Sequence, residues 1–308
     1  MPFSNKKVTL FICGQPFSTL PKGWLTHMPE LSIVAQVEPV TIFSQPPADI
    51  TPVVWTILAK AISDRYKVSS GFVVFHGPDN LLYTASAISF LFKNLTKPII
   101  FTGGSITPQA DRRLEMRANL INAIQGASYE YAEVGLMFGN RFVRANQASR
   151  SEGDTLNMFS APPSGMLGKI DFSIRLADKL VSKNRGATKY IGKLNTNIEV
   201  LTLSPLIDLN GLAKRLPERA GVVINAGMYE HFPKDLRLIL QKAAPNIPVA
   251  VWSLKIPSAS LALKNIILVN NMTWESTVTK FMAIRSETDN IKQIKELMTR
   301  DHAGEIIH

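Results

Sequence analysis

Short apolar runs alternate with amphipathic stretches along the first half of the chain. Residues 72–75 form a continuous β-branched and aromatic run, which is typical of a strand buried on both faces of a parallel sheet. Apolar positions in residues 81–91 recur at roughly 3.6-residue spacing and predict a helix. Residues 98–102 predict a second strand and residues 111–125 a second helix. This order of elements predicts a doubly wound α/β sheet.

The pattern restarts after a polar, basic and glycine-bearing stretch at residues 181–195. Alternating strands and helices are predicted there as strands 198–203, 221–226, 249–254 and 266–269, and helices 206–216, 235–243, 273–285 and 289–299. We therefore predict a larger N-terminal α/β domain (residues 1–183), a linker (residues 184–195) and a smaller C-terminal α/β domain (residues 196–308), each with a parallel sheet.

The turn His-Gly-Pro-Asp-Asn, residues 76–80, joins the first of these strands to its helix. Ligands of doubly wound sheets bind at the carboxyl ends of the strands, which is where this turn lies. Asp79 and Asn80 also occupy the place of a helix N-cap, so that a purely structural role is available to them.

Composition indicates an ordinary globular protein, because 45% of the 308 residues are hydrophobic and 19% are charged. A single cysteine, Cys13, excludes an internal disulfide framework and fits a reducing compartment. The apolar run that follows residues 1–7 is too short for a secretory signal and predicts a first buried strand. No run of about eighteen apolar residues predicts a membrane span. We therefore expect a cytoplasmic protein without membrane association.

The net charge of +10 is the one unusual number and is compatible with an anionic partner. The basic residues are scattered, however, and are not interleaved with aromatic residues, which favours a solvated basic surface over a nucleic-acid site. The five histidines and Cys13 do not cluster at metal-ligand spacing. We expect no metal, no cofactor and no nucleic-acid partner.

Several motifs in this order resemble the bacterial-type asparaginase/glutaminase family from the first strand almost to the end of the chain. They are VTLFICGQPF (8–17), HGPDNLLYTASA (76–87), KPIIFTGG (97–104), ANQASRSEGDTLNMFSAPPSG (145–165) and NNMTWESTVTKFM (270–282). The resemblance implies the fold of that family, in which a threonine attacks a side-chain amide and a second threonine, a lysine and an aspartate activate it.

Residue-by-residue matching to the family motifs places other residue types at the catalytic positions. Pro16 stands at the nucleophile, Pro78 at the second threonine and Arg150 at the lysine. The segment Ser-Gln-Pro-Pro, residues 44–47, stands where the family has a substrate-binding serine. Asp79 matches the aspartate that holds the substrate's amino group. The resemblance thus implies substrate binding by Asp79, with His76, Gly77 and Arg150 beside it.

These replacements argue against the family's chemistry in this chain. Proline has no hydroxyl and no N–H, and the arginine guanidinium stays protonated and cannot act as a base. We therefore expect a non-catalytic homologue with a remodelled pocket for an amino-acid-like molecule, assembled as a homodimer or homotetramer as the resemblance implies. The alternative is an amidohydrolase or acyl-transfer enzyme with a relocated nucleophile, for which Ser18, Thr19 and Cys13 are the candidates.

Each site residue also has a structural interpretation. Asp79 is either a bare helix cap or a ligand for an amino group, and His76 either supports its turn by hydrogen bonds or takes part in chemistry. Arg150 pairs either with an aspartate, Asp79 or Asp154, or with a ligand carboxylate. Cys13 is either a small buried hydrophobe or a thiolate.

Overall fold

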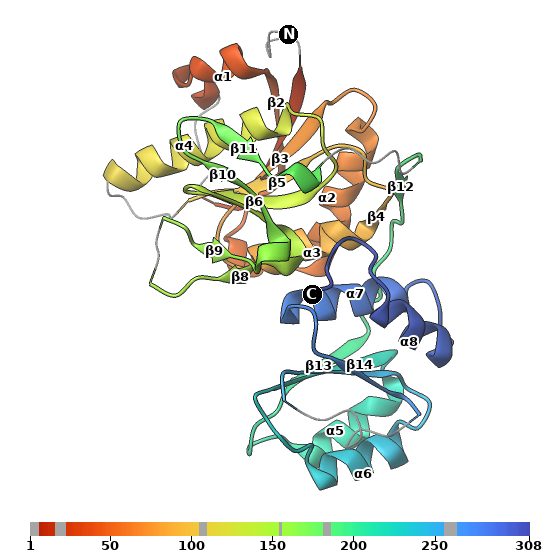
Figure 1. Ribbon diagram of the computed structural model, residues 1–308. Coiled ribbons are helices and arrows are strands. Elements are labelled where there is room, and N and C mark those ends of the chain that lie inside the picture. Colours follow the sequence, from red (N-terminus) through yellow and green to blue (C-terminus); the bar gives the residue numbers. More distant parts are fainter. Residues whose placement is uncertain (1–5, 16–22, 105–109, 154–155, 181–185, 256–263) are drawn as a thin grey trace. The chain divides into compact units, whose positions relative to one another are not determined.

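The computed structural model describes residues 6–15, 23–104, 110–153, 156–180, 186–255 and 264–308. The chain forms two compact units, residues 1–192 and 193–306. Figure 1 shows strands and helices in both units. The point of division lies within the expected linker, of which Lys189–Tyr190 forms a short strand, β12. The expected domain bounds themselves stay a prediction.

The larger unit is built on a sheet of eight strands among the described residues, in the order β11-β10-β7-β6-β5-β3-β1-β2. Its parallel part consists of β1 (Lys7–Cys13), β2 (Gln36–Phe43), β3 (Gly71–His76), β5 (Ile99–Thr102) and β6 (Val134–Phe138). Its antiparallel edge consists of β7 (Arg141–Arg144), β10 (Met166–Ile170) and β11 (Ile174–Leu176). The predicted α/β fold is confirmed, with a parallel-dominated sheet whose antiparallel edge the sequence analysis did not anticipate.

Helices cover both faces of this sheet (Figure 1). They are α1 (Glu30–Val34), α2 (Pro52–Arg65), α3 (Leu81–Leu91) and α4 (Ala110–Ala127). Leu120 and Ile124 of α4 and Leu31 of α1 share one core with Leu10 of β1 and Val73 of β3. The helix α3 is buried at nearly all of its positions, which agrees with its apolar sequence.

Two short antiparallel pairs lie outside this sheet. The strand β4 (Phe92–Lys93) pairs with β12 (Lys189–Tyr190), and β8 (Ser149–Arg150) pairs with β9 (Phe159–Ser160). The pair of β8 and β9 carries Arg150, one of the predicted site residues.

The smaller unit has a fully parallel sheet among its described residues, in the order β13-β14-β15-β16. Its elements are β13 (Ile198–Thr202), α5 (Leu209–Arg215), β14 (Gly221–Gly227), α6 (Lys234–Ala243), β15 (Val249–Ser253), β16 (Ile266–Val269), α7 (Trp274–Arg285) and α8 (Ile291–Thr299). Thr273 caps α7 by accepting a hydrogen bond from the Ser276 N–H at 3.3 Å. The predicted helix start at this threonine is confirmed.

Two glycines of the larger unit provide a matched test of its packing. A Cβ atom at Gly71 would lie 2.0 Å from the backbone oxygen of Ala127, whereas at Gly126 it would lie 2.9 Å from the flexible tips of Ile100 and Met137. We expect Gly71→Ala to lower the free energy of unfolding by about 3 kcal/mol or more, because the backbone at Ala127 cannot move away from the added methyl group. Gly126→Ala should stay within about 1 kcal/mol of the wild type.

Chemical denaturation of both variants measures this difference. Equal stability of the two variants would contradict the packing described for the end of α4 against β3.

Candidate functional site

The carboxyl ends of β1 and β3 lie side by side in the larger sheet, where β1 is next to the edge strand β2. Cys13, the last residue of β1, pairs with His76 at the end of β3 and with Phe43 at the end of β2. Because β1 has β2 on one side and β3 on the other, the winding of the chain reverses at this point. Ligands of open α/β sheets bind at such a reversal. The turn of residues 76–80 therefore lies where a ligand site is expected.

His76 is fully buried and holds the base of this turn. Its Nδ1 lies 2.6 Å from the carbonyl oxygen of Gly77, and its Nε2 lies 3.1 Å from Oγ1 of Thr84 on α3. Burial lowers the pKa of His76 to about 4, although the bond to Gly77 and the charge of Asp79 oppose this shift. The ring is thus neutral at pH 7. Since a carbonyl only accepts, Nδ1 carries the proton. Nε2 is then an acceptor and shares the single hydroxyl proton of Thr84 with the Asn80 carbonyl oxygen, which lies 3.0 Å from Oγ1.

Pro47 lies against the turns that follow β1 and β3. It begins the short helix η4 (Pro47–Asp49) and is buried. A Cβ atom at Gly77 would lie 2.4 Å from Pro47 Cγ, and one at Gly14, whose φ is +98°, would lie 2.9 Å from the same atom. At Gly103, after β5, a Cβ atom would lie 2.1 Å from the backbone oxygen of His76. Side chains at these three glycines would therefore separate the turns.

Asn80 connects the same turn to η4 and not to its own helix. Its Nδ2 donates to the Ala48 oxygen at 3.1 Å and lies 3.4 Å from the Pro47 oxygen. The residue occupies the N-cap position of α3 with a left-handed backbone (φ 57°), and its side chain makes no capping bond. The expected side-chain cap is thus wrong for Asn80, because its amide is used to hold the neighbouring loop.

Asp79 is exposed at the tip of the turn, one residue before the N-cap position. It makes no hydrogen bond or ion pair with another residue that the structure describes, and Pro78 beside it is partly buried. Arg150 is exposed on β8, opposite Phe159 of β9. No ion pair joins Arg150 to Asp79 within the described ranges, and Asp154 lies outside them.

The candidate nucleophiles differ in what the structure describes. Pro16, Ser18 and Thr19 lie outside the described residues. Cys13 is described and is fully buried, and burial raises the pKa of its thiol far above its usual value. The thiol of Cys13 thus has the surroundings of a small core hydrophobe and not those of a reactive thiolate.

The described part of the chain has neither a cluster of metal-ligating side chains nor a helix suited to a membrane. No three histidine, cysteine, aspartate or glutamate side chains lie close enough together to hold a metal ion among the described residues. Within the same residues, no helix is both long and apolar enough to cross a membrane.

Known families and proteins resemble this chain over most of its length. A family model described as "Asparaginase, N-terminal" matches residues 16–182. L-asparaginase 1 of Escherichia coli (strain K12) is 29% identical over 276 residues, which cover 84% of this chain and 81% of that protein. The L-asparaginase of Thermococcus kodakarensis is 23% identical over 290 residues, which cover 88% of this chain and 87% of that protein.

Solved structures agree with these similarities. The crystal structure of L-asparaginase I from Vibrio cholerae has a TM-score of 0.82 and 26% identity, covering 99% of this chain and all of that one. The thermostable L-asparaginase from Thermococcus kodakarensis has a TM-score of 0.85 at 21% identity, with coverage of 98% and 99%. The second likeness supports the fold alone.

The site contains contacts that the sequence analysis missed. Pro47 was noted there within residues 44–47, but not its contacts with Gly14 and Gly77, which join segments far apart in the chain. Thr84 stands in the motif of residues 76–87, and its contact with His76 was not predicted, although a hydroxyl in so apolar a helix is a signal for a buried hydrogen bond.

The buried state of His76 predicts a pH dependence of stability. The folded protein holds His76 neutral down to about pH 4, whereas the unfolded chain protonates it near pH 6.5. Between these values the unfolded state binds more protons, so the free energy of unfolding should fall by up to about 3 kcal/mol as the pH decreases.

Denaturant titrations between pH 7 and pH 4 measure this slope. His76→Gln should remove most of this part of the slope, while His27→Gln, which changes an exposed histidine, should keep it. An unchanged slope in His76→Gln would contradict the assignment.

Proposed function

Because the chain belongs to the asparaginase family, we propose that it is a homologue without catalytic activity that retains a remodelled pocket for an amino-acid-like ligand. The observation that carries this proposal is Pro78, which stands in the site turn between His76 and Asp79. The family has a threonine at this position. Pro78 has neither a hydroxyl nor an N–H that could take part in a proton relay.

The other replacements support the same conclusion. Pro16 takes the place of the attacking threonine, and Arg150 takes the place of the lysine. An alcohol is a weak nucleophile until a neighbouring base removes its proton, and a guanidinium does not serve as that base. His76 does not replace it, because its Nε2 is buried against Thr84.

Binding is supported by the charges that remain. Asp79 is exposed and makes no hydrogen bond or ion pair with another described residue, which supports its carboxylate as the contact for an ammonium group. Arg150 supplies a guanidinium, which binds carboxylates in a bidentate manner. An ammonium and a carboxylate together are the two ends of a free amino acid. We therefore propose Asp79 and Arg150 as the ligand's polar contacts, with His76 and Gly77 shaping the turn.

The alternative is an amidohydrolase or acyl-transfer enzyme on an asparagine-like amide with a relocated nucleophile. The burial of Cys13 speaks against that residue. Ser18 and Thr19 remain the candidates for this second function, and both lie outside the described residues.

The cellular setting follows from the same family membership and from composition. We propose a cytoplasmic protein, in line with its single cysteine, without a nucleic-acid partner. We also propose that the chain forms homodimers or homotetramers. Light scattering at micromolar concentration should then give at least twice the 34.0 kDa of one chain, and a mass of 34.0 kDa would count against assembly.

A thermal-shift screen of the common amino acids tests the pocket. A ligand at about 100 times its Kd should raise the melting temperature by roughly 3–8 °C. Asp79→Asn should abolish this shift and leave the free protein folded, because the side chain makes no hydrogen bond with another described residue.

Asp235→Asn is the matched control, because it removes an exposed charge from the first turn of α6 in the smaller unit. This variant should keep the ligand-induced shift. Equal shifts in the wild type and Asp79→Asn, or no shift with any amino acid, would contradict the proposed contacts.

A further inference from the structure

The last residues of the chain form a compact turn over a buried lysine of α7. We call residues 300–306 the C-terminal strap. Lys280 is 1% exposed and lies on α7, and Glu305 of the strap is fully buried. Their Nζ and Oε1 atoms form an ion pair at 2.6 Å. Buried charges require partners, so this pair ties the end of the chain to the helix.

Lys280 has all three of its donors engaged. Besides Glu305, the ammonium donates to the carbonyl oxygens of Met298 at 2.9 Å and Arg300 at 2.6 Å. A lysine ammonium has three N–H groups and no acceptor. Its hydrogen-bonding capacity is therefore filled by the end of α8 and by the strap.

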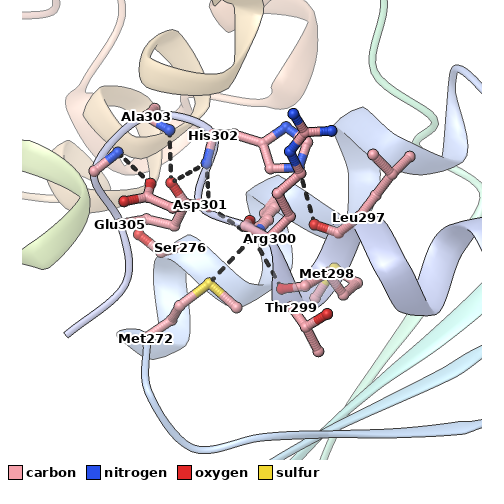
Figure 2. Close-up of polar contacts among 12 residues, drawn as sticks. Met272, Ser276, Leu297, Met298, Thr299, Arg300, Asp301, His302, Ala303 and Glu305 are labelled. Atoms are coloured by element: carbon pink, nitrogen blue, oxygen red, sulfur yellow. Dashed lines mark hydrogen bonds and ion pairs between the residues drawn. The ribbon is translucent and has the colours of Figure 1, made fainter. Parts of the chain in front are cut away.

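The strap also holds its own shape around Glu305 (Figure 2). The carboxylate accepts from the His302 N–H at 3.1 Å and from the Ala303 N–H at 2.7 Å. Asp301 Oδ1 accepts from the Gly304 N–H at 2.6 Å, and Gly304 has a φ of +77°. Such a backbone conformation favours glycine.

Little apolar burial holds the strap in place. Arg300, Asp301 and His302 are exposed, while Glu305 and Ile306 are the buried residues of this segment. In α7, by contrast, every residue from Ser276 to Arg285 is buried. Segments with few buried apolar contacts open at lower free energy than the core.

We propose that the C-terminal strap opens as a unit while the sheet of the smaller unit stays folded, and that Lys280 becomes accessible to solvent in the open form. This proposal does not rest on the proposed ligand site. The ion pair of Lys280 with Glu305 closes the strap, and the left-handed glycine at its turn allows closure without backbone strain.

The pKa shifts of the carboxylates in the strap determine whether opening of the strap increases or decreases with pH. Burial raises the pKa of Glu305, but the charge and hydrogen bond of Lys280 outweigh burial and leave it below its usual value. The pKa of Asp301 is raised by burial and by its hydrogen bond to Glu305. Among the described residues, α8 contributes the Met298 carbonyl and no charged side chain to this pair, and the His302 ring contacts the Leu297 oxygen.

At pH values above the usual carboxylate pKa, ionised Glu305 therefore stabilises the closed strap. This contribution is lost as the pH falls through the pKa that Glu305 has in the closed strap. Asp301 acts in the opposite sense, because its folded pKa is raised. The open fraction of the strap should thus increase only when the pH falls below the usual pKa range of carboxylates.

Labelling of lysines with an amine-reactive reagent, read by mass spectrometry, tests the proposal on the full chain. In the wild type, Lys280 should react on the order of 100-fold more slowly than the exposed Lys292 of α8. Gly304→Ala should raise the Lys280 rate roughly 5- to 30-fold, because alanine is strained in a left-handed conformation. Gly23→Ala, at another left-handed glycine with no atom near its Cβ, should leave that rate unchanged.

Hydrogen exchange of β14 separates strap opening from unfolding of the whole unit. We expect exchange in β14 to stay at its wild-type rate in Gly304→Ala. The proposal is overturned if Lys280 in the wild type reacts as fast as Lys292, if Gly304→Ala leaves it unchanged, or if β14 exchange rises in parallel. If Gly304→Ala does not fold, the wild-type protein alone tests the proposal. Opening that exposes Lys280, measured by labelling, must then be more frequent than the opening of β14 measured by hydrogen exchange.

Discussion

Three glycines allow the turns at the carboxyl edge of the larger sheet to pack closely against the Pro47 ring and against backbone. The Pro47 ring lies against Gly14 and Gly77, and Gly103 lies against the backbone oxygen of His76. Any side chain at these glycines would push apart the turns that follow β1, β3 and β5. The spacing of these turns therefore depends on glycines and on the Pro47 ring. Under the proposed function, these contacts would preserve the shape of the site where the reactive groups differ from those of the family.

The sequence predicts the central elements of both units because their apolar periodicity is strong. Residues 81–91 and 266–269 were predicted as a helix and a strand, and the structure has the same bounds for α3 and β16. The antiparallel strands β7, β10 and β11 were missed. They are three to five residues long, which is too short for a clear apolar period. Two of their pairings are local hairpins, because β7 follows β6 after only Gly139 and Asn140 and β11 follows β10 after a short turn, so the turn residues were a signal that went unused. Only the pairing of β7 with β10 joins segments far apart in the chain.

The sequence predicts which residues lie in the candidate site, but it predicts few of the contacts that they make. The order of motifs places His76, Gly77 and Asp79 in one turn at a strand end, as the structure has them. The role of Asn80 was predicted wrongly, because a capping residue type was assigned its usual partner. Its amide instead donates a hydrogen bond to the backbone oxygen of Ala48, 32 residues earlier. The left-handed backbone of Asn80, which allows this contact, was not predicted from the sequence.

Release of ammonia from L-asparagine and L-glutamine tests the central claim most directly. The assay compares the wild type, Pro16→Thr, and the triple variant Pro16→Thr/Pro78→Thr/Arg150→Lys with a buffer blank. The account predicts no release by the wild type or the single variant, because catalytic groups that act as a unit are strongly non-additive. Within the series, ammonia release should be highest for the triple variant. Saturable ammonia release by the wild-type protein would contradict the account.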